Sequence, residues 1–293
     1  MISLKTNVNS NVPNYIVINN TMDYPENMIQ IKRTFFGFCV SSKPGGAFYI
    51  KNDICSINVI LTVFHHCKSL SHIGIGLRSS SSGGAFCFIG LSASFSYICV
   101  FKCRSEGIGV AFYSQCFDYF IQDINTSTIV FTETLKGKYT FIFEGGVTSI
   151  CGLNSTKNQG NFGTGGSFGS KPLPLSGYIR FSQFSMCGGT SVFLFQVSSM
   201  ENRGNKLCNF LNNSLLDLHT GVLCISSELI IKKFCFFGNT GRQVYTTSKI
   251  YIYDCITDQK SLGAFNLIEG NKVNAHDYRN PKLSFIEICN HQY

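Results

Sequence analysis

The sequence predicts an all-β protein built as a right-handed parallel β-helix of about nine or ten coils with loop insertions. Two short motifs recur in a fixed order, and the segments between them are short and rich in Phe, Ile, Val, Tyr and Thr. No segment has the apolar i, i+3, i+4, i+7 spacing of an amphipathic helix. A unit this short cannot bury its own apolar face, so we expect the units to stack around a continuous core.

The first motif is Gly-Gly-Ala-Phe. It occurs at residues 45–48 and 83–86, as Gly-Val-Ala-Phe at 109–112, and as Gly-Ala-Phe at 263–265. Glycine has no Cβ and adopts positive φ without strain, so the Gly-Gly pair predicts a tight corner. We expect Ala to follow in a cramped inward position and the aromatic residue to begin the next strand.

The second motif is an apolar residue followed three positions later by Cys or Asn. Its last copies end at Cys187, Asn213 and Asn239, which are 26 residues apart, and the longer intervals fit this period with insertions and a degenerate copy near 121–125. Cys and Asn are both small and both form ladders when successive coils stack. The pairs are Phe36 and Cys39, Phe64 and Cys67, Val100 and Cys103, Cys151 and Asn154, Phe184 and Cys187, Phe210 and Asn213, and Phe236 and Asn239, with a looser copy at Ile252 and Cys255.

Two segments interrupt this period and are expected to be surface loops. They are 68–82, rich in Ser, and 152–177, rich in Gly, Asn, Ser and Pro. The repeats divide the chain into an N-terminal cap or first coil (1–33), the β-helix repeats (34–260) and a last coil or C-terminal cap (261–293).

The composition excludes a disordered chain, because only 14% of the residues are charged while 44% are hydrophobic. The formal net charge is +8, but Lys and Arg are scattered along the sequence, with a dense pair at Lys232 and Lys233, so no nucleic-acid partner is expected. The 14 Cys lack the paired CxxC spacing of zinc fingers. Two alternatives remain for them: buried small apolar side chains, or disulfides of an oxidising compartment.

Two features bear on membranes and secretion. The chain does not begin with a basic segment followed by an apolar core, so no secretory signal is expected. The uncharged stretch 79–101 is long enough to span a bilayer, although Ser and Gly interrupt it. Membrane association is therefore left open, with a membrane-inserted protein as one alternative.

The two motifs, in this order, resemble the polymorphic outer-membrane protein family of bacteria, and even more the Cys-rich proteins with such repeats in parasitic protists. The resemblance rests on residues 45–48, 83–86 and 109–112 and on the pairs that end at Asn213 and Asn239, and it covers roughly 34–290. In this chain Phe stands where the family usually has Ile or Leu after Gly-Gly-Ala, and Cys often replaces the Asn. The resemblance implies a right-handed parallel β-helix exposed at a cell surface, with adhesion as its role.

Two groups of residues have the types, but not the spacing, of a catalytic or metal site. Asp118 and Asp123 are the nearest acidic pair in mid-chain, without the acidic and Gly-His-Gly sequences typical of polygalacturonases. The cluster of His65, His66, Cys67 and His72 has poor ligand spacing, because adjacent residues of a strand point to opposite faces.

Two further segments contain residues of a functional motif but lack its full pattern. The Gly-rich segment 163–171 lacks the phosphate-loop pattern and is followed by Pro residues instead of a helix. His276, Asp277 and Arg279 lack a nucleophile motif. We therefore expect no catalytic residue, no cofactor and no metal.

These observations predict a non-enzymatic structural or interaction protein, adhesin-like and either exposed at a cell surface or secreted, or a fragment of one. We expect the lateral face and the loops 68–82 and 152–177 to contact a glycan or a host or partner protein. The alternative is a carbohydrate-active β-helix enzyme, of the polysaccharide lyase or glycosidase type. It predicts two or more carboxylates within about 10 Å on one face.

Overall fold

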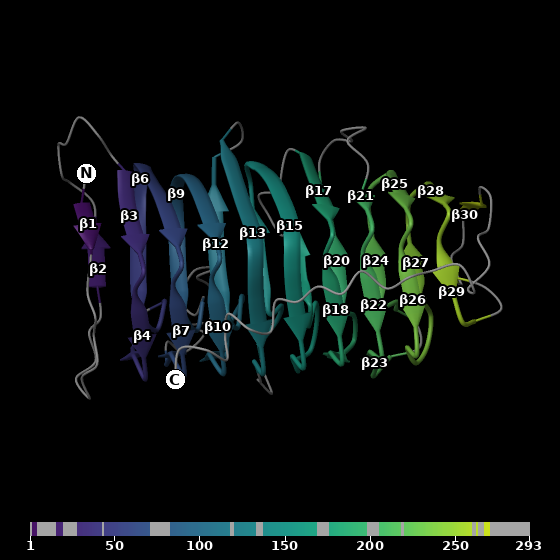
Figure 1. Cartoon of the computed structure of the whole chain (residues 1–293), viewed down its shortest axis with the longest axis horizontal. Helices are drawn as coiled ribbons and strands as arrows, with labels where there is room; N and C mark the ends of the chain where they lie inside the picture. Colours follow the sequence, from purple (N-terminus) through teal and green to yellow (C-terminus); the bar gives the residue numbers. More distant parts are fainter. Residues whose placement is uncertain are drawn as a thin grey trace.

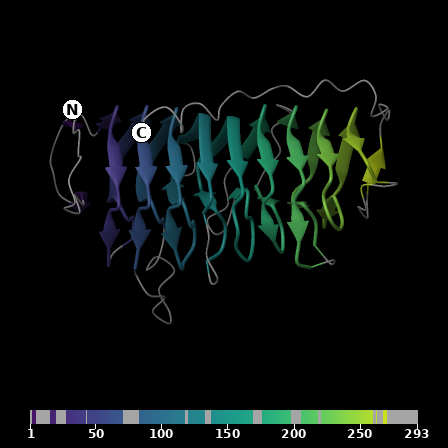
Figure 2. The same cartoon turned by 60° about the horizontal axis from the view of Figure 1, so that its bottom comes forward.

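The computed structural model is a β-solenoid, in which parallel strands stack along one axis (Figure 1). Figure 2 shows the same row of coils from a second side. The structure describes residues 2–4, 16–19, 28–42, 44–70, 83–117, 120–132, 137–168, 176–197, 205–217, 220–259, 262 and 267–269, and these contain strands but no helix. The prediction of an all-β solenoid with parallel strands is confirmed.

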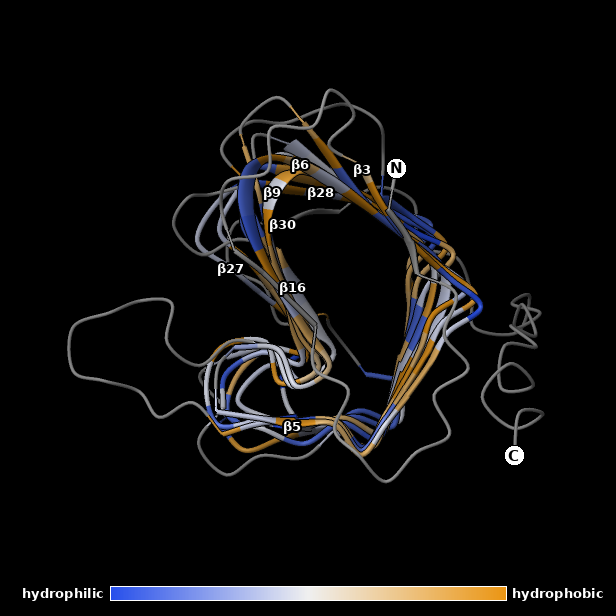
Figure 3. Ribbon diagram, turned by 90° about the vertical axis from the view of Figure 1, so that its left-hand side faces the viewer, coloured by the Kyte–Doolittle hydropathy of each residue, from blue (hydrophilic) through white to orange (hydrophobic). Residues whose placement is uncertain are grey.

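Each coil contributes strands to three long parallel ladders, which form the sides of the solenoid when it is viewed end-on (Figure 3). The first ladder follows the Gly-Gly corner. It contains β2 (Ile16–Asn19), the first parts of β6 (Phe48–Ile60) and β9 (Phe86–Ser96), β12 (Phe112–Cys116), β14 (Phe141–Glu144), β16 (Gly166–Phe168), β20 (Phe193–Phe195), β24 (Leu223–Ile225) and β27 (Val244–Thr246).

The second ladder follows the first along each coil. It contains β1 (Ile2–Leu4), β3 (Met28–Lys32), the second parts of β6 and β9, the first parts of β13 (Ile121–Val130) and β15 (Val147–Thr156), β17 (Ser176–Arg180), β21 (Asn205–Lys206), β25 (Leu229–Lys232), β28 (Ile250–Tyr253) and β30 (Leu267–Glu269).

The third ladder ends at the corner with Cys or Asn. It contains β4 (Phe35–Gly37), β7 (Val63–His65), β10 (Cys99–Phe101), the second parts of β13 and β15, β18 (Gln183–Ser185), β22 (Asn209–Leu211), β26 (Cys235–Phe237) and β29 (Ile256–Thr257). Short strands close the coils: β5 (Val40–Ser41), β8 (Lys68–Ser69) and β11 (Arg104–Ser105) in one group, and β19 (Gly188–Gly189) and β23 (Ser214–Leu215) in another.

Among the described residues, complete coils with a strand in all three ladders run from the coil of β2, β3 and β4 to the coil of β27, β28 and β29. The predicted nine or ten coils include the two ends of the chain. There β1 and β30 pair only in the second ladder, so the described parts of these ends do not add complete coils.

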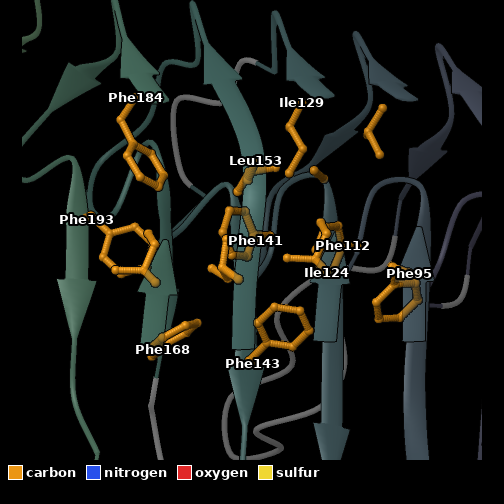
Figure 4. Packing of buried hydrophobic residues seen from close by; sticks show 14 of the residues in the cluster. Phe95, Phe112, Ile124, Ile129, Phe141, Phe143, Leu153, Phe168, Phe184 and Phe193 are labelled. Atoms are coloured by element: carbon orange, nitrogen blue, oxygen red, sulfur yellow. The ribbon is translucent and has the colours of Figure 1, made fainter. Parts of the chain in front are cut away.

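Stacked phenylalanines fill the core. Phe86 lies between Phe48 and Phe112, with ring centroids 5.0 and 4.7 Å apart and planes within 10° of parallel. Like positions in successive coils are one strand spacing apart, about 4.8 Å, which is also a favourable distance for ring stacking. Figure 4 shows the middle of this core, with Phe112, Phe141 and Phe193 on β12, β14 and β20 of the first ladder.

The Gly-Gly corner is built as the motif predicts. Gly83 has a φ of 72°, and a Cβ on Gly84 would lie only 2.2 Å from the backbone oxygen of Val110 in the next coil. Ala85 is fully buried, and its N–H donates to the oxygen of Ala111 at 2.6 Å. The corner therefore needs small residues because the backbones of successive coils approach each other there.

The predicted loop 152–177 is wrong in part, because strands occupy its beginning, a segment of its middle and its end. β15 continues to Thr156 and β16 covers Gly166–Phe168, so within this range only 169–175 lie outside the described residues. Gly166 pairs with Phe193 in the first ladder, at a position where a Cβ would lie 2.2 Å from the ring of Phe141. The loop-like composition thus comes from small residues that make room for neighbouring rings. In the other predicted loop, β8 occupies its start and 71–82 lie outside the described residues.

The register also corrects three copies of the second motif. Ser155 pairs with Phe184, so Ser155 and Asn158 take the positions assigned to Cys151 and Asn154. The degenerate copy is not near 121–125 but at Ile129, which pairs with Val100, and it closes at Thr132. Cys255 lies at the preceding corner, where the Phe234 N–H donates to its sulfur at 3.4 Å. In these coils Ile129, Ser155 and Thr257 take the place of the expected inward aromatic residue.

Candidate partner-binding surface

A buried column of small side chains forms the corner after the third ladder. It includes Cys39, Cys67, Cys103, Thr132, Asn158, Cys187, Asn213 and Asn239. The Cys67 thiol donates to the oxygen of Phe36 in the preceding coil at 3.4 Å. The side-chain amide of Asn213 donates to the equivalent oxygen, that of Phe184, at 3.0 Å.

Asparagine makes one contact at this corner that cysteine does not reproduce. The Asn213 Oδ1 accepts the backbone N–H of Cys187 at 2.9 Å, and the Asn239 Oδ1 accepts that of Asn213 at 2.9 Å. Cys and Asn can therefore replace each other in the column because both satisfy the same carbonyl, while Asn also satisfies an N–H group.

The cysteines that the structure describes are free thiols, with Cys99 as the exception. Burial raises the pKa of the Cys187 and Cys255 thiols to about 12. These thiols stay protonated at neutral pH, which makes them poor nucleophiles and poor metal ligands. For the free cysteines, the structure supports the alternative of buried small apolar side chains.

The residue before each corner points outward. Phe38, His66 and Phe131 have φ values of 55°, 54° and 56°, in the left-handed region that non-glycine residues rarely adopt. Hydrogen bonds between coils hold these turns: the Phe38 N–H donates to the His65 oxygen at 2.8 Å, and the His66 N–H to the Phe101 oxygen at 2.9 Å. This backbone leaves Phe38 64% exposed and Phe131 40% exposed.

Aromatic rings next to this corner form a continuous strip on the outer side of the third ladder. We define the aromatic strip as Phe35, Phe38, His65, His66, Phe101 and Phe131. His65 stacks on Phe101 with centroids 5.2 Å apart and planes 4° apart, Phe38 stacks on His66 at 5.0 Å, and Phe101 meets Phe131 edge-on at 5.7 Å. The strip covers the adjacent strands β4, β7, β10 and β13.

Two lysines border the strip, while its histidines are neutral at pH 7. Lys102 Nζ lies 5.2 Å from the centroid of the Phe101 ring, and Lys157 Nζ lies 4.8 Å from that of Phe131. Burial, His66 and Lys102 together lower the pKa of His65 to about 4. Burial and Lys102 also lower the pKa of His66. The strip is therefore an aromatic surface with cations at its edge.

The histidine cluster differs from the expectation in its geometry. The left-handed turn at His66 breaks strand alternation, so its Nδ1 lies 3.1 Å from the Nδ1 of His65 instead of on the opposite face. Cys67 points into the buried column, and His72 lies outside the described residues. Among the described residues, no group of three or more His, Cys, Asp or Glu could hold a metal ion.

Of the other sequence-predicted candidates, the structure describes Asp123 and part of the Gly-rich segment. Asp123 accepts hydrogen bonds from Ser94 at 3.2 Å and Asn125 at 2.5 Å, and burial raises the pKa of its carboxyl group. Of the Gly-rich segment, 163–168 belong to a coil. Asp118, the remainder 169–171, His276, Asp277 and Arg279 lie outside the described residues.

Sequence reasoning missed a buried polar pair on the outer side of the first ladder. The Tyr113 hydroxyl donates to Glu144 Oε2 at 2.5 Å, and Glu144 is only 4% exposed. Burial, together with Glu144, raises the pKa of Tyr113. Ile108 and Tyr139 pack against the buried cluster that contains Tyr113. The two residues are 31 positions apart, so only the strand register could have paired them.

Comparisons with protein-family models, with curated proteins and with solved structures gave no match. In the described part of the chain, no helix is long and apolar enough to cross a membrane. Of the stretch 79–101, residues 83–101 contain β9 and β10 of the solenoid.

Proposed function

We propose that this chain is a non-enzymatic interaction protein of the adhesin type, exposed at a cell surface or secreted, and that the aromatic strip contacts a partner protein. The supporting observation is the exposure of Phe38 and Phe131 within one continuous set of ring contacts. Single exposed apolar residues are ordinary, but a contiguous aromatic patch with a polar rim is typical of protein interfaces.

The rigidity of the solenoid supports this role. The strip is held by strand pairing on one side and by left-handed turns with hydrogen bonds between coils on the other. Side chains on a fixed backbone lose little conformational entropy on binding, which favours affinity. The β-solenoid fold alone does not indicate a function, so the proposal depends on this surface and on the resemblance to the surface-exposed repeat proteins.

The test is binding of the purified chain to intact cultured cells, measured by flow cytometry. The variant Phe38→Ser with Phe131→Ser should reduce binding about 30-fold, the effect of losing a hot spot of about 2 kcal/mol. Protease treatment of the cells should remove binding of the native chain. The control is Ile54→Ser with Leu216→Ser, which changes two exposed apolar residues outside the strip. Equal binding by the strip variant and the control would contradict the proposal.

A second candidate, a carbohydrate-active enzyme, is favoured by one observation. Glu144 is a buried carboxylate hydrogen-bonded to a tyrosine, an arrangement frequent at catalytic sites. Degradation of a panel of polysaccharides by the native chain, and its loss in Glu144→Gln, would support this candidate. An inactive native chain would dismiss it.

A further inference from the structure

Three cations occupy equivalent positions in successive coils of the second ladder. Arg180 of β17 pairs with Lys206 of β21, which pairs with Lys232 of β25. The three residues are 26 positions apart along the sequence, so one period of the repeat separates each from the next. With about 4.8 Å between strands, their Cα atoms extend over roughly 10 Å of the outer face. We call them the basic row.

The basic row is accessible. Lys206 and Lys232 are exposed, and Arg180 is half-buried. Lys233, also exposed, follows Lys232 at a left-handed corner with a φ of 57° and adds a fourth cation. The cations are far apart along the chain, and the coil period brings them together.

Tyrosines hold two of the cations in place. The guanidinium carbon of Arg180 lies 4.5 Å from the centroid of the Tyr178 ring, and Lys232 Nζ lies 5.3 Å from that of Tyr253. Tyr253 pairs with Lys232 in the register and so continues the row into the next coil. These cation–π contacts order the charged groups.

We infer that the basic row binds a linear sulfated polysaccharide. Cations repeated at a fixed spacing on a rigid sheet match an extended chain with repeated anionic groups, and the positive net charge assists its approach. Arg binds planar or tetrahedral oxyanions in a bidentate manner, and tyrosine hydroxyls supply hydrogen bonds for sugar oxygens.

A single-stranded nucleic acid is the other polyanion that combines cations with aromatic residues. Its proteins stack bases on open aromatic faces. Here Arg180 and Lys232 lie over the rings of Tyr178 and Tyr253, so each ring has one face occupied by a cation. The polysaccharide therefore fits these contacts better.

The test is titration of the purified chain with heparin in about 0.1 M salt, where exposed charges are only partly screened. The variant Arg180→Ala, Lys206→Ala, Lys232→Ala should bind heparin about tenfold more weakly, as expected for three exposed ionic contacts. It should also leave a heparin column at lower salt. The control is Lys51→Ala, Arg104→Ala, Lys138→Ala, which removes the same charge from exposed cations outside the second ladder and should bind like the native chain.

Three results would overturn the inference. The first is equal heparin affinity of the basic-row variant and the native chain, with both giving the same thermal unfolding curve. The second is tighter binding of a single-stranded oligonucleotide than of heparin. The third is equal binding of hyaluronan, which has carboxylates but no sulfates. Phe38→Ser with Phe131→Ser should leave heparin affinity unchanged, because the aromatic strip lies on the third ladder, so this proposal and the partner-protein proposal can fail separately.

Discussion

The two corners with recurring motifs are built in opposite ways. At the Gly-Gly corner the backbone of the next coil occupies the place of a side chain: a Cβ on Gly46 would lie 2.1 Å from the oxygen of Gly84. At the Cys/Asn corner a side chain is required, because the thiol or amide satisfies a carbonyl of the preceding coil. One corner is thus restricted by space and the other by hydrogen bonding.

The difference explains the variability of the two motifs. The register aligns Gly163-Thr164, Thr190-Ser191 and Thr220-Gly221 with the Gly-Gly pair of the motif, so each of these coils lacks at least one of the two glycines. The Cys/Asn position accepts several side chains: Thr132 also occupies it, and its hydroxyl donates to Asn158 Oδ1 at 2.8 Å. Substitution of a glycine at the Gly-Gly corner should therefore lower the stability of the fold more than a substitution at the Cys/Asn corner.

The largest effect is expected for Gly84→Ala. The new methyl group would overlap with the backbone of Val110 and Arg104, and backbone atoms of a stacked coil cannot move aside. We expect a loss of more than about 4 kcal/mol in the free energy of unfolding, measured by urea denaturation. The control is Gly37→Ala, whose Cβ meets only the end of the Phe35 ring and should cost about 1 kcal/mol. Similar losses in both variants would show that backbone proximity does not restrict the Gly-Gly corner.

Asn213→Ala should have the next largest effect. It leaves the buried N–H of Cys187 and the buried oxygen of Phe184 without their partner. Each unsatisfied group costs about 1–3 kcal/mol, so we expect a total near 3 kcal/mol in the same denaturation experiment. Asn212→Ala changes the adjacent exposed residue and should cost about 1 kcal/mol, the strain of Ala at positive φ. A loss for Asn213→Ala no larger than that of Asn212→Ala would contradict the hydrogen-bonding account.

Asn213→Cys separates the contributions of the two hydrogen bonds that Asn213 makes at the Cys/Asn corner. The thiol should donate to the Phe184 oxygen, as Cys67 does to that of Phe36, but it supplies no comparable acceptor for the Cys187 N–H. We expect about half of the loss seen for Asn213→Ala, because one of two groups is satisfied. If Asn213→Cys were as unstable as Asn213→Ala, the interchange of Cys and Asn in the sequence would need another explanation.

The sequence was sufficient to predict the fold class, because both motifs mark corners and their period marks stacking. The sequence did not predict the arrangement of side chains at corners where the backbone makes a left-handed turn. The rule of alternating faces fails at His66, since a left-handed turn places its ring beside that of His65. The pairing of Tyr113 with Glu144 depends on a register that insertions obscure. The basic row could have been predicted from the sequence. Arg180, Lys206 and Lys232 are each one 26-residue period apart, so the period places them at equivalent positions of successive coils.

The smallest expected effect concerns the outer side of the Cys/Asn corner and is pH-dependent. The folded chain keeps His65 neutral down to its pKa of about 4, whereas an unfolded histidine takes up a proton near pH 6.5. Between these values the unfolded state binds more protons, so the free energy of unfolding should fall as the pH is lowered from about 6.5 to 4. His65→Gln removes this titration, so its stability relative to the native chain should improve steadily over that range in parallel urea denaturations. A constant difference between the two proteins would mean that the packing of His65 against Phe101 and His66 does not hold its imidazole neutral.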